Sequence, residues 1–342
     1  MKIQIRTLAA AGLLLGFFVV GLGAWTRLAD AGLSCPDWPT CYGHLTWPTS
    51  PDEIARADAL YADDAPYSVA LAIPEMIHRI VAGALGLLVL GLLILALRHR
   101  TGLTRRALTI TSVLAGLIVA QATFGYLTVS LKLWPHIVVT HLLGGFSVLA
   151  LLFWLWLETG PAPRSGPAGA PRILAWGALI AVVLQIALGG WLSANYAALA
   201  CTELPGCRQG AFWPPMDFAS GFNLFGLDIG VNYLGGALSQ ESRTAIHIVH
   251  RLWALVVCAL VITWAWQLRS FGWRLLAPGG ADASPAAWLL LLVGMQFSLG
   301  LLNIVLQLPL GIAVAHNLGA ALLLLAGVYA LHRSSTMEAS PA

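Results

Sequence analysis

Long apolar segments separated by short polar ones dominate the pattern of this chain. Eight of them contain very little charge, and each has the roughly 20 residues that a helix needs to cross about 30 Å of hydrocarbon. They cover approximately residues 8–26, 78–97, 107–128, 136–157, 173–193, 246–267, 286–307 and 310–331. The pattern predicts an all-α integral membrane protein with eight transmembrane helices. The first segment lacks a small-x-small cleavage site, so we expect a retained helix and not a signal peptide.

The composition agrees with this prediction. Of 342 residues, 58% are hydrophobic and 10% are charged, and a soluble domain of this size could not bury so much apolar surface. The net charge of +3 gives no indication of a nucleic-acid partner. Membrane lipids are the partners that the composition implies.

Of the 18 Lys and Arg residues, 11 lie at one end of the predicted helices. These residues are Lys2, Arg6, Arg98, Arg100, Arg105, Arg106, Arg164, Arg172, Arg269, Arg274 and Arg333. At the other end, two long loops, about 28–74 and 194–245, are net acidic. Because cytoplasmic connections are enriched in Lys and Arg, we expect both termini in the cytoplasm and both long loops outside.

Four of the five cysteines occur as two pairs in these long loops. Cys35 and Cys41 are six residues apart, as are Cys201 and Cys207. Thiols in an oxidising compartment usually form disulfides, which we expect here. A metal site is the alternative, although zinc prefers the closer C-x-x-C spacing.

The chain also contains an internal repeat. The segment "ETGPAPRSGPAGAPR" (Glu158 to Arg172) is rich in Pro, Gly and Ala and divides four predicted helices from four. On either side the same features recur in order: "GAWTRLADAGLSCPDWPTC" and "GGWLSANYAALACTELPGC", "AQATFGYLTV" and "GMQFSLGLLNIV", "VVTHLLGG" and "AVAHNLGA". We therefore expect a half at 1–158, a cytoplasmic linker at 159–172 and a second half at 173–342. Four crossings keep the orientation, so the halves should be two pseudo-symmetric four-helix bundles, each with a loop outside the cytoplasm.

Four histidines occupy matching positions in the two halves: His78, His141, His250 and His316. We expect His141 roughly 8 Å and His316 roughly 9 Å inside their helices, with His78 and His250 shallower. One intramembrane histidine can simply bond to a neighbouring helix. Two pairs at matched depth in four-helix bundles favour axial ligation of two iron porphyrins, whereas zinc would require a third protein ligand.

The remaining intramembrane and interfacial histidines carry weaker signals. His99 and His332 lie among arginines at helix ends and are expected to be solvated. His136 is five residues from His141, so it should point from another face of the helix.

Charged residues next to the histidines suggest further roles. Arg79 and Arg251 directly follow His78 and His250, and could bind porphyrin propionates or extend to lipid head groups. The halves differ one helical turn earlier, where Glu75 in the first half corresponds to His247 in the second. Glu75 could be an acid favoured near a helix N-terminus, or an acid or base in chemistry confined to the N-terminal half. His247 would then be a residue that supports its neighbouring heme ligand.

Together, "TRLADAGLSCPDWPTCYG", "EMIHRIVAGALG", "VVTHLLGG", "IHIVHR" and "AVAHNLGA" resemble heme A synthase, in its proteobacterial and mitochondrial branch. The resemblance implies a bacterial inner-membrane enzyme that oxidises the C8 methyl of heme O to the formyl of heme A by stepwise hydroxylation, for cytochrome c oxidase assembly. It also implies that Glu75 is catalytic, that His78 and His141 hold the substrate heme, and that His250 and His316 ligate a resident heme b.

The resemblance also implies heme O synthase and cytochrome oxidase assembly factors as partners. It is compatible with a homo-oligomer. Members of this branch often lack the first cysteine pair, so Cys35 and Cys41 could be redox-active or only structural. The alternative function is a di-heme electron-transfer cytochrome linked to quinol, which explains the histidines but not the difference at Glu75.

Overall fold

A computed structural model describes residues 2–61, 66–161, 172–208, 210–270 and 284–335. Its eight long helices are α1 (Lys2–Leu28), α3 (Val69–Arg98), α4 (Arg105–Ser130), α5 (Pro135–Glu158), α6 (Arg172–Ala194), α8 (Gln240–Ser270), α9 (Pro285–Val305) and α10 (Leu310–Ser335). Three short helices are α2 (Pro51–Leu60), η1 (Arg100–Gly102) and α7 (Phe218–Gly221). The eight long helices have the length and composition to cross a membrane, which confirms the predicted fold class.

Two helices begin well before the predicted positions. His78 lies nine residues after Val69, the first residue of α3, and His250 lies ten residues after Gln240, the first of α8. The prediction that these two histidines are shallower than His141 and His316 is therefore wrong. Pro74, Glu75 and Arg79 interrupt the apolar pattern of α3, so the prediction placed the start of this helix too late. Pro74 nevertheless lies within the helix, where it removes one backbone hydrogen bond near the N-terminus.

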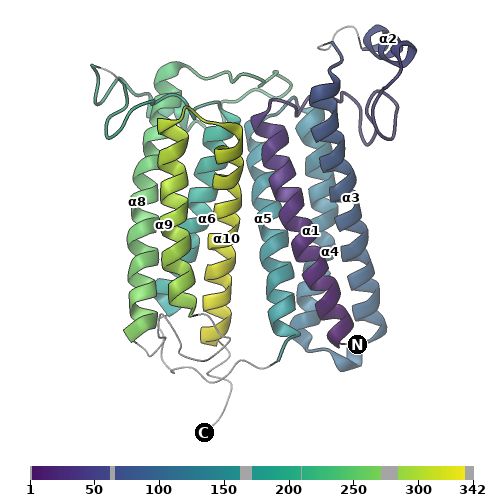
Figure 1. Cartoon of the computed structure of the whole chain (residues 1–342), viewed down its shortest axis with the longest axis vertical. Coiled ribbons are helices and arrows are strands. Elements are labelled where there is room, and N and C mark those ends of the chain that lie inside the picture. The colour runs from purple at the N-terminus through teal and green to yellow at the C-terminus, as the bar shows by residue number, and fades with distance from the viewer. Residues whose placement is uncertain (1, 62–65, 162–171, 209, 271–283, 336–342) are drawn as a thin grey trace.

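The long helices form two bundles side by side (Figure 1). In the first, α1 packs on α3 and α5, and α4 packs on α3 and α5; in the second, α6 and α9 pack in the same way on α8 and α10. Between the bundles, α1 contacts α10, α5 contacts α6, and α5 contacts α10. A twofold rotation that exchanges the halves exchanges these contacts as well, so the packing has the pseudo-symmetry expected from the repeat.

The turns at the end of each half repeat this symmetry. Lys132 and Leu133, between α4 and α5, have positive φ angles of 49° and 61°. Gln307 and Leu308, between α9 and α10, have angles of 58° and 60°. Non-glycine residues seldom adopt this conformation, so its recurrence in two consecutive residues supports a common origin of the halves.

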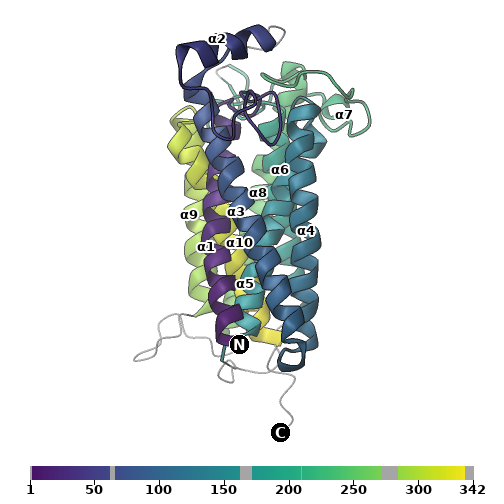
Figure 2. The same cartoon turned by 90° about the vertical axis from the view of Figure 1, so that its right-hand side faces the viewer.

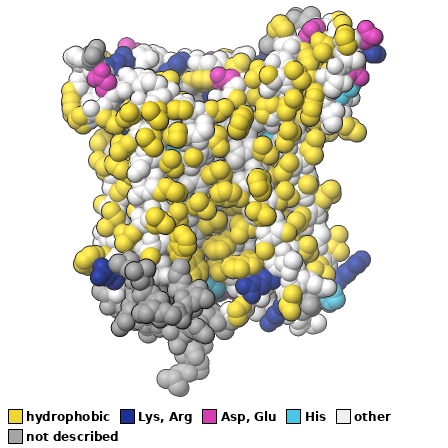
Figure 3. Space-filling model, viewed as in Figure 1, with side chains coloured by type: hydrophobic (Ala, Val, Ile, Leu, Met, Phe, Trp, Pro, Cys, Tyr) yellow, Lys and Arg dark blue, Asp and Glu magenta, His cyan; other side chains and the backbone are white. Residues whose placement is uncertain are grey.

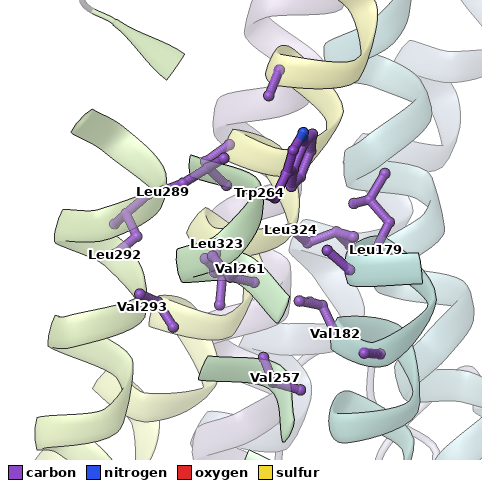
Figure 4. Packing of buried hydrophobic residues seen from close by; sticks show 14 of the residues in the cluster. Leu179, Val182, Val257, Val261, Trp264, Leu289, Leu292, Val293, Leu323 and Leu324 are labelled. Atoms are coloured by element: carbon purple, nitrogen blue, oxygen red, sulfur yellow. The ribbon is translucent and has the colours of Figure 1, made fainter. Parts of the chain in front are cut away.

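Each bundle contains a large cluster of buried apolar side chains, and the cluster of the C-terminal half also includes Phe146 and Leu149 of α5. In the C-terminal half, Trp264 is fully buried among Leu179, Leu289 and Leu324, and Figure 4 shows these side chains meeting from four helices. The N-terminal half has a similar cluster around Leu92 and Leu152. These clusters fix the helices whose other ends carry the histidines.

The two long loops lie at one end of the molecule, which we call the loop end; Figure 2 shows α2 at this end, and α7 packs on α8. The loop of the C-terminal half reaches the other half: Trp134 donates a hydrogen bond to the Leu227 carbonyl and the Tyr233 N–H donates to the Lys132 carbonyl. The visible acidic side chains lie at the loop end and most Lys and Arg at the opposite end (Figure 3). The cytoplasmic location of that basic end stays a prediction; Arg164, Arg274 and most of the 159–172 linker lie outside the described residues.

Candidate functional site

A cavity of about 1470 Å³ extends through the loop-end part of both bundles. His78, His141, His250 and His316 all line it. Ligand pockets usually have about 300–1,000 Å³, so this cavity exceeds what one small ligand requires. Its size and the two histidine pairs fit two large flat ligands, one in each half.

Each histidine ring lies against a glycine of a neighbouring helix. A Cβ atom added to the glycine would lie 3.0–3.6 Å from the Cε1 atom of the imidazole. The four pairs are Gly23 with His78, Gly125 with His141, Gly189 with His250, and Gly300 with His316. Larger residues at these glycines would displace the rings, so the glycines determine where the imidazoles can stand.

The histidines have the properties of ligands for a bound metal centre. In all four, Nδ1 is buried without a hydrogen-bond partner among the described residues. His78 lies close enough to His141, and His250 to His316, for each pair to interact electrostatically. The described residues contain no group of three or more His, Cys, Asp or Glu able to hold a metal ion, so a pair of imidazoles fits heme iron better than zinc.

Glutamines accompany the histidines, and sequence reasoning missed this role. The Gln185 amide donates to the His250 carbonyl at 3.1 Å and lies 3.3 Å from His250 Nε2. Gln296 lies 3.3 Å from Nε2 of His316. Its counterpart in the repeat, Gln121, has a buried amide nitrogen without a described partner. The recurrence of Gln four residues before a glycine, in "QATFG" and "QFSLG", was the available signal.

Glu75 is buried at the loop-end side of the N-terminal cavity and is only 4% exposed. Its carboxylate accepts hydrogen bonds from the Ser34 hydroxyl at 2.8 Å and the Cys35 N–H at 3.0 Å, and pairs with Arg79. It is outside the first turn of α3, so favourable interaction with the helix terminus does not explain it. At the equivalent position His247 is also buried and its Nδ1 lies 2.9 Å from the Ala197 carbonyl.

Arg79 and Arg251 hold the two disulfide loops. Arg79 donates to the carbonyls of Cys35, Asp37 and Thr40. Arg251 donates to those of Cys201, Glu203 and Gly206, which are the equivalent positions of the second loop. The interpretation that these arginines extend to lipid head groups is wrong because their terminal nitrogens are directed to the protein. Propionate binding by either residue stays a prediction.

Arg27 is a third cation in the cavity lining, and sequence reasoning missed it. Its Nη2 donates to the Ser193 carbonyl of the other half, and its guanidinium lies over the Tyr196 ring, 4.2 Å from the centroid. Its Nε is buried without a described partner. A carboxylate in the cavity could use this donor, since charge-assisted hydrogen bonds from guanidinium are strong.

Both predicted disulfides are present, Cys35–Cys41 and Cys201–Cys207, and all four cysteines are buried. Within the first loop, Asp37 accepts hydrogen bonds from the Thr40 hydroxyl and the N–H groups of Gly43 and Tyr42. Partial burial raises the pKa of Asp37, but these hydrogen bonds outweigh it and hold the pKa below its ordinary value of 3.8.

Four histidines lie outside the cavity lining, and one of them, His44, is in the first long loop. His99 is exposed, as expected. His332 is buried, 3% exposed, with Nε2 3.9 Å from the Glu158 carboxylate, so the prediction that it is solvated is wrong. His136 packs between Trp134 and Trp191, with ring centroids 4.6 and 5.3 Å away, so it does point away from the cavity at the contact between the halves.

Comparison with known proteins shows which family this chain resembles. A protein named heme A synthase from Shewanella oneidensis is 41% identical over 97% of this chain and 98% of its own length. Proteins with the same name from Methylobacterium sp. (strain 4-46) and Wolbachia pipientis are 30% and 25% identical, over 90% and 92% of this chain and 85% and 92% of theirs. The family model described as cytochrome oxidase assembly protein matches residues 6–328. Since this match covers both bundles and all the cavity histidines, the chain belongs to that family of cytochrome oxidase assembly proteins.

Proposed function

We propose that this protein is a heme A synthase, an oxidoreductase that converts the C8 methyl of heme O into the formyl of heme A. Relatives with that name match nearly the whole chain. The observation that carries the proposal is a buried carboxylate beside one histidine pair and not the other: Glu75 lines the N-terminal cavity, and His247 replaces it in the C-terminal half. A protein that only relayed electrons would not require this difference.

The N-terminal half holds the substrate. His78 and His141 present buried imidazole nitrogens from facing helices and are the residues to bind the iron of heme O. Glu75 lies three residues from His78 towards the loop end, so we place the C8 methyl near its carboxylate. The Ser34 hydroxyl, the Cys35 N–H and Arg79 orient that carboxylate as a proton acceptor during successive hydroxylations of the methyl. Each hydroxylation takes its oxygen from water, releases two protons and passes two electrons to an acceptor outside this chain.

The C-terminal half holds a resident heme b, with His250 and His316 as axial ligands. Bound heme b would supply a one-electron relay. Its site fits the residues present, because both imidazoles have a buried nitrogen without a described partner and each lies on a glycine. Gln185 and Gln296 hold the two rings in orientation.

The proposed setting is the bacterial inner membrane, with termini in the cytoplasm and the loop end in the periplasm. This orientation rests on the concentration of Lys and Arg at the opposite end of the helices. Heme O synthase is the proposed source of substrate, and cytochrome oxidase assembly factors are proposed recipients of the product. The halves correspond to 1–158 and 173–342.

The test replaces Glu75 by Ala and by Gln and analyses extracted hemes by chromatography and mass spectrometry. General acid–base catalysis contributes about 10²–10⁴-fold, so we expect at least a ~100-fold loss of heme A, with accumulation of heme O or its alcohol and unchanged heme b. Glu241→Ala, at an exposed glutamate of the other half, is the control. Normal heme A from the Glu75 variants would exclude the catalytic role. Heme b alone, with no effect of deletion on cellular heme A, would support the electron-transfer alternative.

A further inference from the structure

The cavity walls of the two halves differ in size on the α3 and α8 side. Gly83 and Gly86 of α3 lie five and eight residues after His78. The residues at the same distances after His250 in α8 are Leu255 and Cys258. All four residues line the cavity. A Cβ atom added to either glycine would have no neighbour within 4 Å, so the space beside them is open.

The facing helix shows a change in the same direction. Ala122 of α4 corresponds to Phe297 of α9, each directly after the repeated glutamine, and both line the cavity. Three residues earlier, Val119 of α4 lines the cavity where α9 has Gly294, a smaller opposite change. Counting side-chain heavy atoms at these four positions, the N-terminal wall has nine fewer than the C-terminal wall.

This wider region opens to the outside of the bundle, between α3 and α4. Leu87 and Val119 line the cavity and are also 73% and 60% exposed on the lipid-facing surface. It lies one to two turns from His78 towards the membrane interior, roughly 8–12 Å along α3. Glu75 lies on the other side of His78, towards the loop end.

The substrate has a matching chemical asymmetry. Heme O carries a long isoprenoid tail at the edge of the macrocycle opposite its propionates, and heme b lacks that tail. The methyl that is oxidised adjoins the propionate edge. This methyl and the tail are on neighbouring pyrrole rings, not on opposite ones. A porphyrin bound at His78 and His141 with its propionates towards the loop end therefore places the methyl on the side near Glu75 and directs its tail away from the loop end, towards Gly83 and Gly86.

We infer that Gly83, Gly86 and Ala122 form a groove for the isoprenoid tail of heme O, open to lipid between α3 and α4. This inference rests on the proposed function and names the feature that distinguishes the substrate from the resident heme. In the C-terminal half, the larger side chains of Leu255, Cys258 and Phe297 stand at the equivalent positions and narrow this space, so that site accepts a porphyrin without a tail. The groove also gives the tail a path from the bilayer into the cavity.

The test transfers the C-terminal residues into the N-terminal half, as Gly83→Leu, Gly86→Cys and Ala122→Phe, singly and together. The purified full-length protein, with its C-terminal heme b in place, is titrated with heme O and separately with heme b, and binding is followed by absorbance. We expect the triple variant to bind heme O at least tenfold more weakly, whereas its affinity for heme b should change less than threefold. The control is Gly91→Leu, a glycine of α3 with equally open surroundings that does not line the cavity.

The outcomes separate this inference from the proposed function. Equal weakening of both hemes, or no change in either, would overturn the groove. A variant that loses its C-terminal heme b has been perturbed in folding. In that case Gly83→Ala, which adds only one methyl group, is tested instead. Weaker binding of heme O with unchanged binding of heme b supports the groove, and unchanged binding of both refutes it. Tail-dependent binding without any heme A formation by the unmodified protein would refute the proposed function and leave the groove intact.

Discussion

Removing the arginine that holds a disulfide loop should open that loop and leave the other unaffected. Arg251 donates to three carbonyls at 2.8–3.0 Å, all within the short loop closed by Cys201–Cys207. Arg251→Gln keeps a polar side chain of moderate length but removes the charged, forked donor. Arg79→Gln makes the same change in the N-terminal half.

The size of the effect follows from these contacts. Hydrogen bonds from a charged donor contribute about 1.5–3 kcal/mol each, so three would give at most about 9 kcal/mol. Water replaces part of this when the loop opens at the membrane surface, and about 3 kcal/mol is a reasonable net value. Because about 1.4 kcal/mol corresponds to a factor of ten, opening should become roughly 100-fold more frequent. Arg79→Gln should have the larger effect because it also leaves the buried Glu75 carboxylate without its cation.

The rate of disulfide reduction by a phosphine measures this opening, because the buried cysteines react only after the loop opens. Labelling of the released thiols and peptide mass analysis report both disulfides in the same molecule. Arg251→Gln should accelerate reduction of Cys201–Cys207 alone, and Arg79→Gln that of Cys35–Cys41 alone. Reduction rates within threefold of the unmodified protein would refute the assigned role of these arginines.

Two other predictions use neighbouring groups. Since the folded-state pKa of Asp37 is lowered, its stabilisation of the first loop is present above pH 3.8 and is lost as pH falls through the lower folded value. Reduction of Cys35–Cys41 at pH 5 should thus be faster in Asp37→Asn than in the unmodified protein, and the difference should disappear at strongly acid pH; a constant difference would contradict this. Gln185→Leu removes about one hydrogen bond from His250, worth about 1 kcal/mol, so heme b should transfer to apomyoglobin about fivefold faster. Transfer at an unchanged rate would exclude a positioning role for Gln185.

The features that could be predicted from sequence are those encoded locally or by repetition. Hydropathy over about 20 residues located all eight helices, and the similar separations of His78 from His141 and of His250 from His316 pointed to four residues that line the cavity. The cysteine pairs were predictable because each spans only six residues in a loop. The starts of α3 and α8 were not. The first turn of α8 is polar, and in α3 the residues Pro74, Glu75 and Arg79 interrupt the apolar pattern that begins at Val69.

The features that could not be predicted depend on long-range contacts. Arg79 reaches carbonyls 39–44 residues away, and only the folded loop brings these oxygens together. His332 is buried because α10 packs on α5, which places it beside Glu158. From sequence alone, both residues had the pattern of charged groups at a helix end, and propionates or solvent were the natural partners to assign.

The two halves share one set of features around the cavity and differ in another. Imidazole pairs, the glycines beneath them and the arginine-held loops are common to both bundles, so they cannot account for chemistry in one bundle alone. The differences lie on both sides of His78: a carboxylate towards the loop end at Glu75, and open space towards the membrane interior at Gly83 and Gly86. In the proposed substrate the oxidised methyl and the isoprenoid tail are on neighbouring pyrrole rings. A porphyrin with its propionates towards the loop end can therefore place the methyl near Glu75 and the tail beside Gly83 and Gly86. Exchange of these residues between halves should therefore change which porphyrin each half accepts, while the imidazoles continue to bind iron in both.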